Sequence, residues 1–324
     1  MQPFKSVSYA VPQPGSRLIV LGAVHGNETC GTRAIERVIA EIDAGSLRLG
    51  SGRVTFVPVT NPLAYANHRR AGDRNLNRKL SPTDTPREFE DHVANWLCPL
   101  LAEHEVLLDL HSFTAPGTPF VFMGPADNDG AIEPFIRAAR EEALALRLGV
   151  GRAVDGWLTT YAAGVARRQA HAAKFPEATL DLDPRYGIGS TEYMRSTGGS
   201  ALTLECGQHD DDDAPSVGYR AIVNTLAHLG LIDAPDPTPQ PMECLSLCEV
   251  IDRLHPDDSF ARAWRSFDPI SAGEAIGTRH DGSAIVAPFS GFMVFPNPTA
   301  EPGHEWFYLA RPSARLAPVA RALE

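Results

Sequence analysis

Two histidines and two glutamates in this sequence have the side-chain types that bind metal ions and transfer protons. His25 and Glu28 lie three residues apart, directly after an apolar run at 18–24, and His111 and Glu205 each end another apolar run. Imidazole nitrogens and carboxylate oxygens are usual ligands of catalytic zinc, which takes three protein ligands and leaves a fourth position to water. We therefore predict that His25, Glu28 and His111 bind one zinc ion.

Glu205 is left for a different role at the same site. As a general base it would take a proton from the attacking water, whose pKa a zinc ion lowers to about 7. Asp109 lies two positions before His111, on the same face of the predicted strand, and we expect it to orient that histidine. The alternative roles are structural: a lone histidine is often a hydrogen-bonded core residue, and Glu205 could form a salt bridge with a loop arginine.

These residues need a scaffold that brings strand ends together. Apolar runs without polar alternation are typical of strands covered on both faces of a parallel sheet, and such sheets bind ligands at the carboxyl ends of their strands. Because the runs alternate with helical patterns, we predict an α/β fold with a mixed, mainly parallel sheet and helices on both faces. The predicted strands are 18–24, 54–60, 106–111, 120–123 and 201–205, and the predicted helices are 31–44, 87–104, 131–148, 161–174 and 217–229.

A proline-rich stretch divides the chain. Every second residue from Pro235 to Pro241 is a proline, so this stretch is typical of a semi-rigid linker. Short β-type runs at 284–286 and 291–295, separated by glycine and proline turns, follow it. We predict a catalytic α/β domain at 1–232, a linker at 233–242 and a small, mostly β domain at 243–324.

The amino-acid composition and net charge disfavour some classes of binding partner. The chain of 324 residues is 43% hydrophobic and 21% charged, as in ordinary soluble proteins. Its net charge of -11 opposes binding to nucleic acid or anionic membranes. Five scattered cysteines suit a reducing compartment, and no segment has the apolar core of a signal peptide or the length of a membrane span. We expect a cytoplasmic protein with a small-molecule substrate; a homo-oligomer is left open.

An arginine-rich loop lies between two of the predicted ligand strands. Residues 67–78 contain Arg69, Arg70, Arg74 and Arg78, interleaved with asparagine and aspartate. A fixed guanidinium stabilises the negative charge that develops on a carbonyl oxygen during hydrolysis, and it also binds carboxylates in a bidentate manner. Many charge runs are only solvated surface, but the position of this one favours a role in substrate binding.

Five motifs occur in a characteristic order: His25-Gly26-Asn27-Glu28-Thr29, Asn61-Pro62, Leu76-Asn77-Arg78, Asp109-Leu110-His111 and Leu204-Glu205-Cys206-Gly207. Between residues 17 and 207 the chain thus resembles the succinylglutamate desuccinylase and aspartoacylase family, which is similar in its catalytic domain to zinc carboxypeptidases. The resemblance implies one zinc ion on His25, Glu28 and His111, with Glu205 as base, Arg70 at the scissile carbonyl, Asn77 and Arg78 at a substrate carboxylate and Arg195 at a second carboxylate.

The implied reaction is hydrolysis of the amide between an acyl group, succinyl or acetyl, and the nitrogen of an acidic or related amino acid. The chain departs from the family at Asn75, where aspartoacylases have an acidic residue, and no clear match for their C-terminal tyrosine occurs between Pro296 and Tyr308.

Two other functions use the same features. A carboxypeptidase-like peptide hydrolase would share the metal ligands, and a catalytically silent metal-binding or ligand-binding protein would lack only turnover. A zinc deaminase is disfavoured, because that chemistry requires His-x-Glu followed by Pro-Cys-x-x-Cys, and this chain has His-x-x-Glu at His25 to Glu28.

Overall fold

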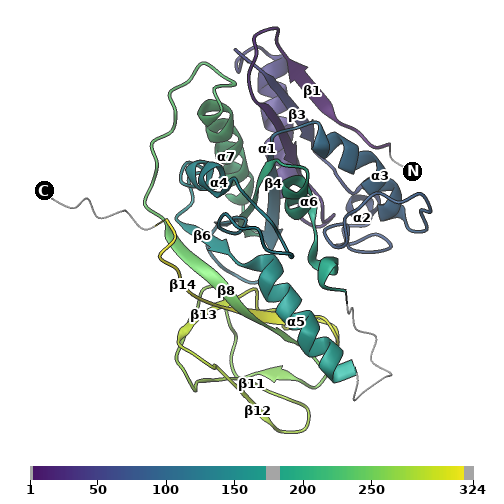
Figure 1. Ribbon diagram of the computed structural model, residues 1–324, viewed down its shortest axis with the longest axis vertical. Coiled ribbons are helices and arrows are strands. Elements are labelled where there is room, and N and C mark those ends of the chain that lie inside the picture. Colours follow the sequence, from purple (N-terminus) through teal and green to yellow (C-terminus); the bar gives the residue numbers. More distant parts are fainter. Residues whose placement is uncertain (1–2, 173–182, 317–324) are drawn as a thin grey trace, which may run out of the picture.

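Among the described residues, eleven strands form one large sheet, and many of its strands are labelled in Figure 1. The computed structural model describes residues 3–172 and 183–316. In spatial order the strands are β1 (Val7–Ala10), β3 (Arg53–Val57), β2 (Arg17–Leu21), β4 (Val106–Phe113), β7 (Ser200–Gln208), β5 (Phe120–Phe122), β6 (Arg152–Asp155), β8 (Glu243–Asp252), β14 (Glu305–Pro312), β13 (Gly291–Val294) and β10 (Pro269–Ile270). The neighbours β3, β2, β4 and β7 run parallel, whereas β5 is antiparallel to β7. This confirms the predicted mixed α/β fold.

Helices cover both faces of the parallel part. The helices α1 (Cys30–Asp43) and α7 (Ala214–His228) contribute to the core on one face, and α3 (Phe89–Ala102) and α6 (Ser190–Ser196) contribute to the core on the other. The remaining helical elements are α2 (Pro62–Ala66), α4 (Ala138–Ala145), α5 (Trp157–Ala172) and the short 3₁₀ turn η1 (Pro184–Gly187). Across the described ranges, no helix combines the length and the apolar character that crossing a membrane requires.

The apolar runs of the central strands are explained by burial on both sides. Along β2, Leu18 and Val20 point into one core, and Ile19 and Leu21 point into the other. Successive side chains of a strand alternate between the faces of the sheet, so both sets of positions must be apolar when helices cover both faces. The eight residues of β4 are likewise all buried.

Several predicted elements have different bounds in the structure, and three of them have a visible cause. The helix predicted at 131–148 is limited to α4, because Asn128 and Phe135 pair with each other before it and the carboxylate of Asp127 accepts a hydrogen bond from Ala138 N at 2.8 Å. The helix predicted at 87–104 is α3, which continues through its proline. The strand predicted at 54–60 is β3, which ends just before a proline that has no N–H for the ladder.

The helix predicted at 161–174 and the region after the linker can be compared with the structure in the same way. The helix predicted at 161–174 is α5, which begins earlier, and positions 173–174 lie outside the described residues. Beyond 242 the described elements are strands, as predicted. Strand β8 pairs in parallel with β6, so the large sheet continues across residues 233–242, and the division into domains stays a prediction. A second sheet contains β12 (Ala284–Val286), β11 (Ala275–Thr278) and β9 (Ser259–Phe260).

Asp258 organises the loop that follows β8. Its buried carboxylate accepts hydrogen bonds from the backbone N–H groups of Leu254 (2.8 Å), His255 (3.2 Å) and His280 (2.9 Å), and from the guanidinium of Arg279 (2.8 Å). Burial raises the pKa of Asp258, but these donors outweigh burial and lower the pKa to about 2. The carboxylate is therefore a fixed acceptor for four donors at neutral pH.

This pKa gives a pH-dependent prediction for stability. A carboxyl group whose pKa is lower in the folded state stabilises the fold above its unfolded pKa, near 3.9, and loses that contribution as the pH falls through its folded pKa. We expect Asp258→Asn to reduce the free energy of unfolding by about 2 kcal/mol between pH 5 and 8, measured by urea denaturation, with a smaller difference near pH 3. The exposed neighbour Asp257 offers a control, Asp257→Asn, which should change little. An equal loss at pH 3 and pH 7 would contradict the prediction.

Candidate active site

A short turn at the carboxyl end of β2 carries the first two predicted ligands. The N–H of Glu28 donates to the carbonyl of His25 at 3.1 Å, and α1 begins at Cys30. Gly26 lies so close to α2 that a Cβ atom there would come within 2.0 Å of the backbone carbonyl carbon of Ala64. The turn can follow this path only because residue 26 has no side chain.

Gly26→Ala is therefore expected to disturb both the fold and the site. The new methyl group meets backbone atoms, which cannot rotate away, so we expect a loss of about 3 kcal/mol in the free energy of unfolding. Gly50→Ala is the matched control, because a Cβ atom at Gly50 would meet nothing within 4 Å. Thermal or urea unfolding of both variants measures the difference. Equal stability of the two variants would show that the contact at Gly26 is unimportant.

The three residues predicted as metal ligands lie together at the ends of two neighbouring parallel strands. His25 Nδ1 is 2.8 Å from Glu28 Oε1, and His111 Nδ1 is 2.8 Å from Glu28 Oε2. Each residue offers one ligand atom, and these atoms all lie within 4.8 Å of one another. All three side chains are buried. Two imidazole nitrogens and a carboxylate therefore converge as a candidate metal site.

The other ring nitrogen of each histidine lies close to an oxygen atom of a second residue. His111 Nε2 lies 3.0 Å from the carboxylate of Asp109, as the spacing predicts, and Asp109 also accepts a hydrogen bond from Ser190 Oγ. His25 Nε2 lies 3.0 Å from the side-chain oxygen of Asn75. That oxygen also accepts from the backbone N–H of Asn77 at 2.9 Å, which identifies it as the acceptor. Both rings are thus oriented with Nδ1 toward Glu28.

Asn75 was missed as a site residue by sequence reasoning, which noted it only as a departure from the family. Nothing in the local pattern indicates that the Asn75 amide lies against His25, fifty positions earlier in the chain. The same is true of Glu90, whose buried carboxylate accepts hydrogen bonds from Asn61 Nδ2 (2.7 Å) and from the backbone of Gly72 (2.9 Å), and thereby holds the arginine-rich loop against the sheet. Only the folded chain reveals these two supports.

Burial and neighbouring charges set the protonation of the cluster. Burial lowers the pKa of His25 to about 4, and the nearby guanidinium of Arg70 acts in the same direction, so this ring is neutral at pH 7. Burial raises the pKa of Glu28, but the two histidines outweigh it and hold the pKa well below its usual value. For His111, burial lowers the pKa, and the carboxylates of Asp109 and Glu28 outweigh burial and raise it. Glu28 is therefore ionised and His25 is neutral, as metal ligands must be.

Glu205 lies on β7 directly opposite His111 of β4 in the parallel register. Its side chain is buried, and within the described part of the chain its Oε2 atom has no hydrogen-bond partner. Burial raises the pKa of Glu205 to about 8, against the lowering effect of His111. A carboxyl group that is buried beside the cluster and not engaged elsewhere is able to exchange a proton near neutral pH.

Arg70 also reaches the cluster. Its Nη1 atom donates to Glu28 Oε1 at 2.9 Å, while its side chain remains 52% exposed. The guanidinium thus lies at the mouth of the site, with one face toward solvent. The arginine-rich loop is therefore part of the site, and the structure brings Arg70 together with Glu205 and the three predicted ligands.

One cavity of about 930 Å³ connects the cluster with a second group of side chains. At one end lie His25, Glu28, His111, Arg70 and Glu205. At the other end the walls come from the arginine-rich loop, α5, η1 and the C-terminal part of the chain, and they include Asn77, Arg78, Trp157, Tyr161, Tyr186, Glu305 and Tyr308. The C-terminal strand β14 therefore supplies part of the cavity wall.

Tyr308 is a third residue that sequence reasoning did not assign to the site. It lies on β14 and is buried, and among the described residues its hydroxyl has no hydrogen-bond partner. A buried phenol with a free donor in a cavity wall is suited to bind a polar group of a ligand. Its position on β14 could not be read from local pattern, because the only available signal was a lone tyrosine in an aromatic stretch.

Asn77 and Arg78 are consecutive residues in the wall of the cavity. Asn77 Oδ1 accepts a hydrogen bond from Ser190 N at 2.9 Å. Arg78 Nη1 donates to the Asn77 carbonyl at 2.8 Å, and its guanidinium carbon lies 4.9 Å from the centre of the Trp157 ring. Both residues thus line the same cavity as the cluster, as the predicted role in substrate binding requires, and that role stays a prediction.

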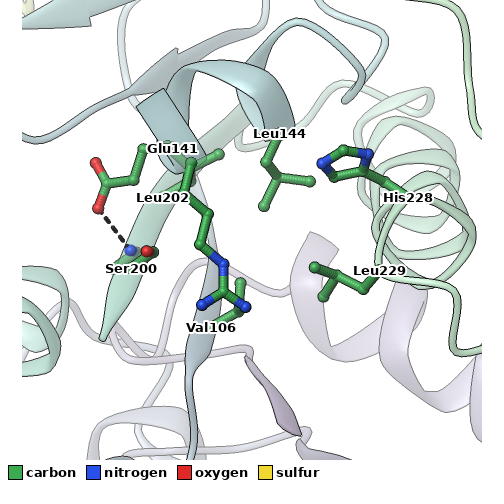
Figure 2. A pocket seen from close by; sticks show the side chains of 9 residues that line it. Val106, Glu141, Leu144, Ser200, Leu202, His228 and Leu229 are labelled. Atoms are coloured by element: carbon green, nitrogen blue, oxygen red, sulfur yellow. Dashed lines mark hydrogen bonds between the residues drawn. The ribbon is translucent and has the colours of Figure 1, made fainter. Parts of the chain in front are cut away.

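Arg195 has a different environment from the other predicted substrate residues. It lines the cavity, but its Nε donates to Glu141 (2.8 Å), its Nη1 to Glu133 (2.9 Å) and its Nη2 to the carbonyl of Ala201 (2.8 Å), and Glu192 lies 3.5 Å away. Glu141 also accepts from Ala201 N and borders a small cavity of about 50 Å³ between α4 and β7 (Figure 2). The prediction that Arg195 binds a substrate carboxylate stays untested, and in the structure its guanidinium is occupied by protein groups.

Fold and site together define a class, an α/β protein with a His, Glu, His cluster and a buried glutamate at the carboxyl ends of parallel strands. Residues 14–145 match the succinylglutamate desuccinylase/aspartoacylase catalytic domain. No protein of curated function matches the sequence.

Several solved structures have the same fold. A succinylglutamate desuccinylase/aspartoacylase from Rhodobacter sphaeroides is 19% identical, with a TM-score of 0.69 over 93% of this chain and 87% of that one. Succinylglutamate desuccinylase from Vibrio cholerae is 19% identical, with a TM-score of 0.67 over 93% and 82%. The ectoine utilization protein EutE (DoeB) from Ruegeria pomeroyi is 16% identical, with a TM-score of 0.67 over 92% and 86%. At these identities the likeness establishes the fold alone.

Proposed function

We propose that this chain is a zinc-dependent amidohydrolase that removes an acyl group, acetyl or succinyl in type, from the nitrogen of an amino acid. The observation that carries the proposal is the convergence of His25, Glu28 and His111 beside Glu205 in one cavity. The match of residues 14–145 to the catalytic domain of succinylglutamate desuccinylases and aspartoacylases supports the reaction type. The identity of the metal, the acyl group and the role of each residue are parts of the proposal.

The donor set fits a catalytic zinc ion. Such sites combine imidazole and carboxylate ligands from three residues, and here His25, Glu28 and His111 would hold the ion. Asn75 and Asp109 fix the other ring nitrogens of the histidines, an arrangement that is typical of metal sites. When bound, zinc would polarise the substrate carbonyl and lower the pKa of a water molecule.

The other cavity residues would act on the substrate and on the proton. Glu205 would take the proton from the attacking water and return it to the leaving amine nitrogen. The guanidinium of Arg70, at the mouth of the cluster, would stabilise the negative charge that develops on the carbonyl oxygen. Arg78, with Asn77 beside it, would bind the carboxylate of the amino acid and so place the amide bond next to Glu205.

The role of Asn75 can be tested by its effect on the metal. Asn75→Leu keeps the size of the side chain but removes the acceptor for His25 Nε2, so the ring is no longer held with Nδ1 toward Glu28. We expect zinc affinity to fall by about 10 to 100-fold, measured by competition with a chelator. Asn67→Leu is the control, because Asn67 is exposed and is not among the residues that line the cavity. Equal affinity of the two variants would remove Asn75 from the site.

The proposed function is tested by metal analysis combined with a substrate panel. We expect about one zinc per chain and release of free amine from N-acetyl or N-succinyl amino acids, with loss of activity after chelation and recovery with zinc. Cleavage of peptides in preference to N-acyl amino acids would favour the carboxypeptidase alternative. Metal binding without hydrolysis of any of these compounds would favour a silent metal-binding protein. The predicted cytoplasmic location and the oligomeric state are separate questions.

A further inference from the structure

A protein carboxylate lies beside Arg78, the arginine proposed to bind the substrate. Glu305 Oε1 is 3.9 Å from Arg78 Nη2 and 3.6 Å from Arg168 Nη2. Arg168 in turn forms two hydrogen bonds of 2.7 Å with the carboxylate of Asp252. Two arginines and two acidic residues, contributed by the arginine-rich loop, α5, β8 and β14, therefore balance one another before any substrate is bound.

The carboxyl group of Glu305 is ionised at this position. Burial raises the pKa of Glu305, but the guanidinium groups of Arg78 and Arg168 outweigh burial and lower the pKa. The side chain is only 20% exposed, so solvent screens its charge little. A ligand that reaches Arg78 thus meets a fixed negative charge next to the positive one.

Arg78 is nevertheless able to bind one carboxylate. Within the described residues its guanidinium makes one hydrogen bond, to the carbonyl of Asn77, and the 3.9 Å separation from Glu305 leaves the remaining N–H groups available. The free hydroxyl of Tyr308 is a further donor in the same wall. After one carboxylate has bound, however, the four charged side chains and the ligand carry a net charge of about -1, and a second carboxylate would find no unbalanced cation at this end.

The other arginine offered by the family pattern does not change this charge balance. Arg195 is surrounded by Glu133, Glu141 and Glu192, at 2.9, 2.8 and 3.5 Å. Its single positive charge is therefore outnumbered by three carboxyl groups of the protein. A second substrate carboxylate at this position would add to an existing excess of acidic groups.

The rest of this end of the cavity is aromatic. The ring centres of Trp157 and Tyr308 are 5.4 Å apart, those of Phe122 and Trp157 are 6.2 Å apart, and those of Phe122 and Phe295 are 5.8 Å apart. Helix α5, which carries Trp157, runs along the C-terminal strands in Figure 1. These rings form a continuous apolar wall that excludes a charged group more strongly than an uncharged one.

We propose that the substrate has a single free carboxylate, which binds at Arg78, and a large uncharged group. The uncharged group packs against the aromatic wall of Phe122, Trp157, Phe295 and Tyr308. Glu305 is the residue that selects against a second carboxylate. This inference rests on the proposed function and narrows it. It departs from the acidic amino acid that the sequence predicts, because both arginines available for acidic groups are matched by carboxylates of the protein itself.

The test compares substrates that differ only in charge or only in apolar size. With the zinc-loaded protein, we expect kcat/KM for N-acetylglutamine to exceed that for N-acetylglutamate by about tenfold or more, and N-acetyl-leucine to exceed N-acetylglycine. Hexanoylglycine carries its apolar group on the acyl side of the amide, whereas N-acetyl-leucine carries it on the amino acid side. Comparing kcat/KM for these two compounds therefore shows which side of the amide bond packs against the aromatic wall. Equal or faster hydrolysis of N-acetylglutamate would overturn the inference. Failure to hydrolyse any of the five would overturn the proposed function instead.

A second measurement does not depend on turnover. Isothermal titration of the metal-free protein with N-acetylglutamine and N-acetylglutamate gives the ratio of their dissociation constants, which we expect to favour glutamine by about tenfold. Glu305→Gln should shift this ratio toward glutamate by a similar factor. Glu249→Gln makes the same chemical change on the neighbouring strand, where Glu249 pairs with Leu309 of β14, and should leave the ratio unchanged. A ratio that is the same in both variants, with melting temperatures near that of the wild type, would remove Glu305 from selection.

Discussion

Glu205→Gln is expected to lower kcat by about 10² to 10⁴-fold, the range that a positioned general acid or base contributes. The amide is nearly the same size as the carboxyl group, but it cannot accept the proton of the attacking water or return it to the leaving nitrogen. His25, Glu28 and His111 are unchanged, so zinc should remain at about one per chain. Steady-state kinetics on an N-acyl amino acid, together with metal analysis of the same sample, measures both quantities.

The control for this variant is Glu249→Gln, which makes the same chemical change on a strand outside the cavity and should retain full activity. If Glu205→Gln bound zinc and hydrolysed substrate at the rate of the wild type, another residue would have to transfer the proton. If it lost zinc as well as activity, Glu205 would be a ligand and the assignment of the base would be wrong.

Arg195→Met is expected to reduce the free energy of unfolding by about 3–5 kcal/mol, the usual cost of removing one partner from a buried ion pair. The guanidinium side chain is only 3% exposed and is paired with Glu141 and Glu133. Methionine fills most of the space of the arginine stem, so the loss reports mainly the acidic groups that are left without a cation. Urea denaturation at pH 7 provides the measurement.

The pH dependence separates a charge effect from a packing effect. Burial already raises the pKa of Glu133 to about 7 in the presence of Arg195, and without the arginine we expect a further increase. A carboxyl group with a raised folded pKa is destabilising above that pKa, and the cost disappears below its unfolded pKa. The stability deficit of Arg195→Met should therefore be larger at pH 8 than at pH 5.

Arg37→Met serves as the matched control, because Arg37 is 55% exposed, and both its ion pair with Glu41 and its contact with the Tyr219 ring at 3.6 Å lie at the surface of the protein. Pairs of this kind contribute little, so this variant should stay close to the wild type at every pH. A deficit in Arg195→Met that did not vary with pH would mean that packing, and not the cluster of carboxyl groups, explains the loss.

Much of the parallel core and of the candidate metal site follows from local sequence. The runs before His25, His111 and Glu205 are continuous and apolar because β2, β4 and β7 are covered on both faces. Parallel neighbours bring their carboxyl ends to one edge, so residues far apart in the chain meet without any further information. Asp109 is found in the same way, since a residue two positions before His111 shares its face of the strand.

A helix was harder to predict where tertiary contacts keep part of a helix-favouring sequence in a loop. Residues 131–148 are rich in alanine, leucine and charged residues, which favours a helix along their length. In the structure Phe135 pairs with Asn128 and Asp127 caps the N-terminus of α4, so the first part of this stretch is a loop. Tertiary contacts of this kind override propensity, and no periodic pattern reports them.

By itself, the sequence determined which strands end in metal-binding side chains, because burial and the parallel arrangement act on consecutive residues. Only the tertiary structure decided what surrounds them: that Asn75 holds His25, that Arg195 is paired with carboxylates, and that Glu305 and Tyr308 reach the cavity from β14. These contacts join residues from separate elements, and each depends on how loops and the C-terminal strands pack. The physical reason is that a contact between distant residues is determined by the free energy of the whole fold. The spacing of neighbouring residues in the sequence therefore does not predict it.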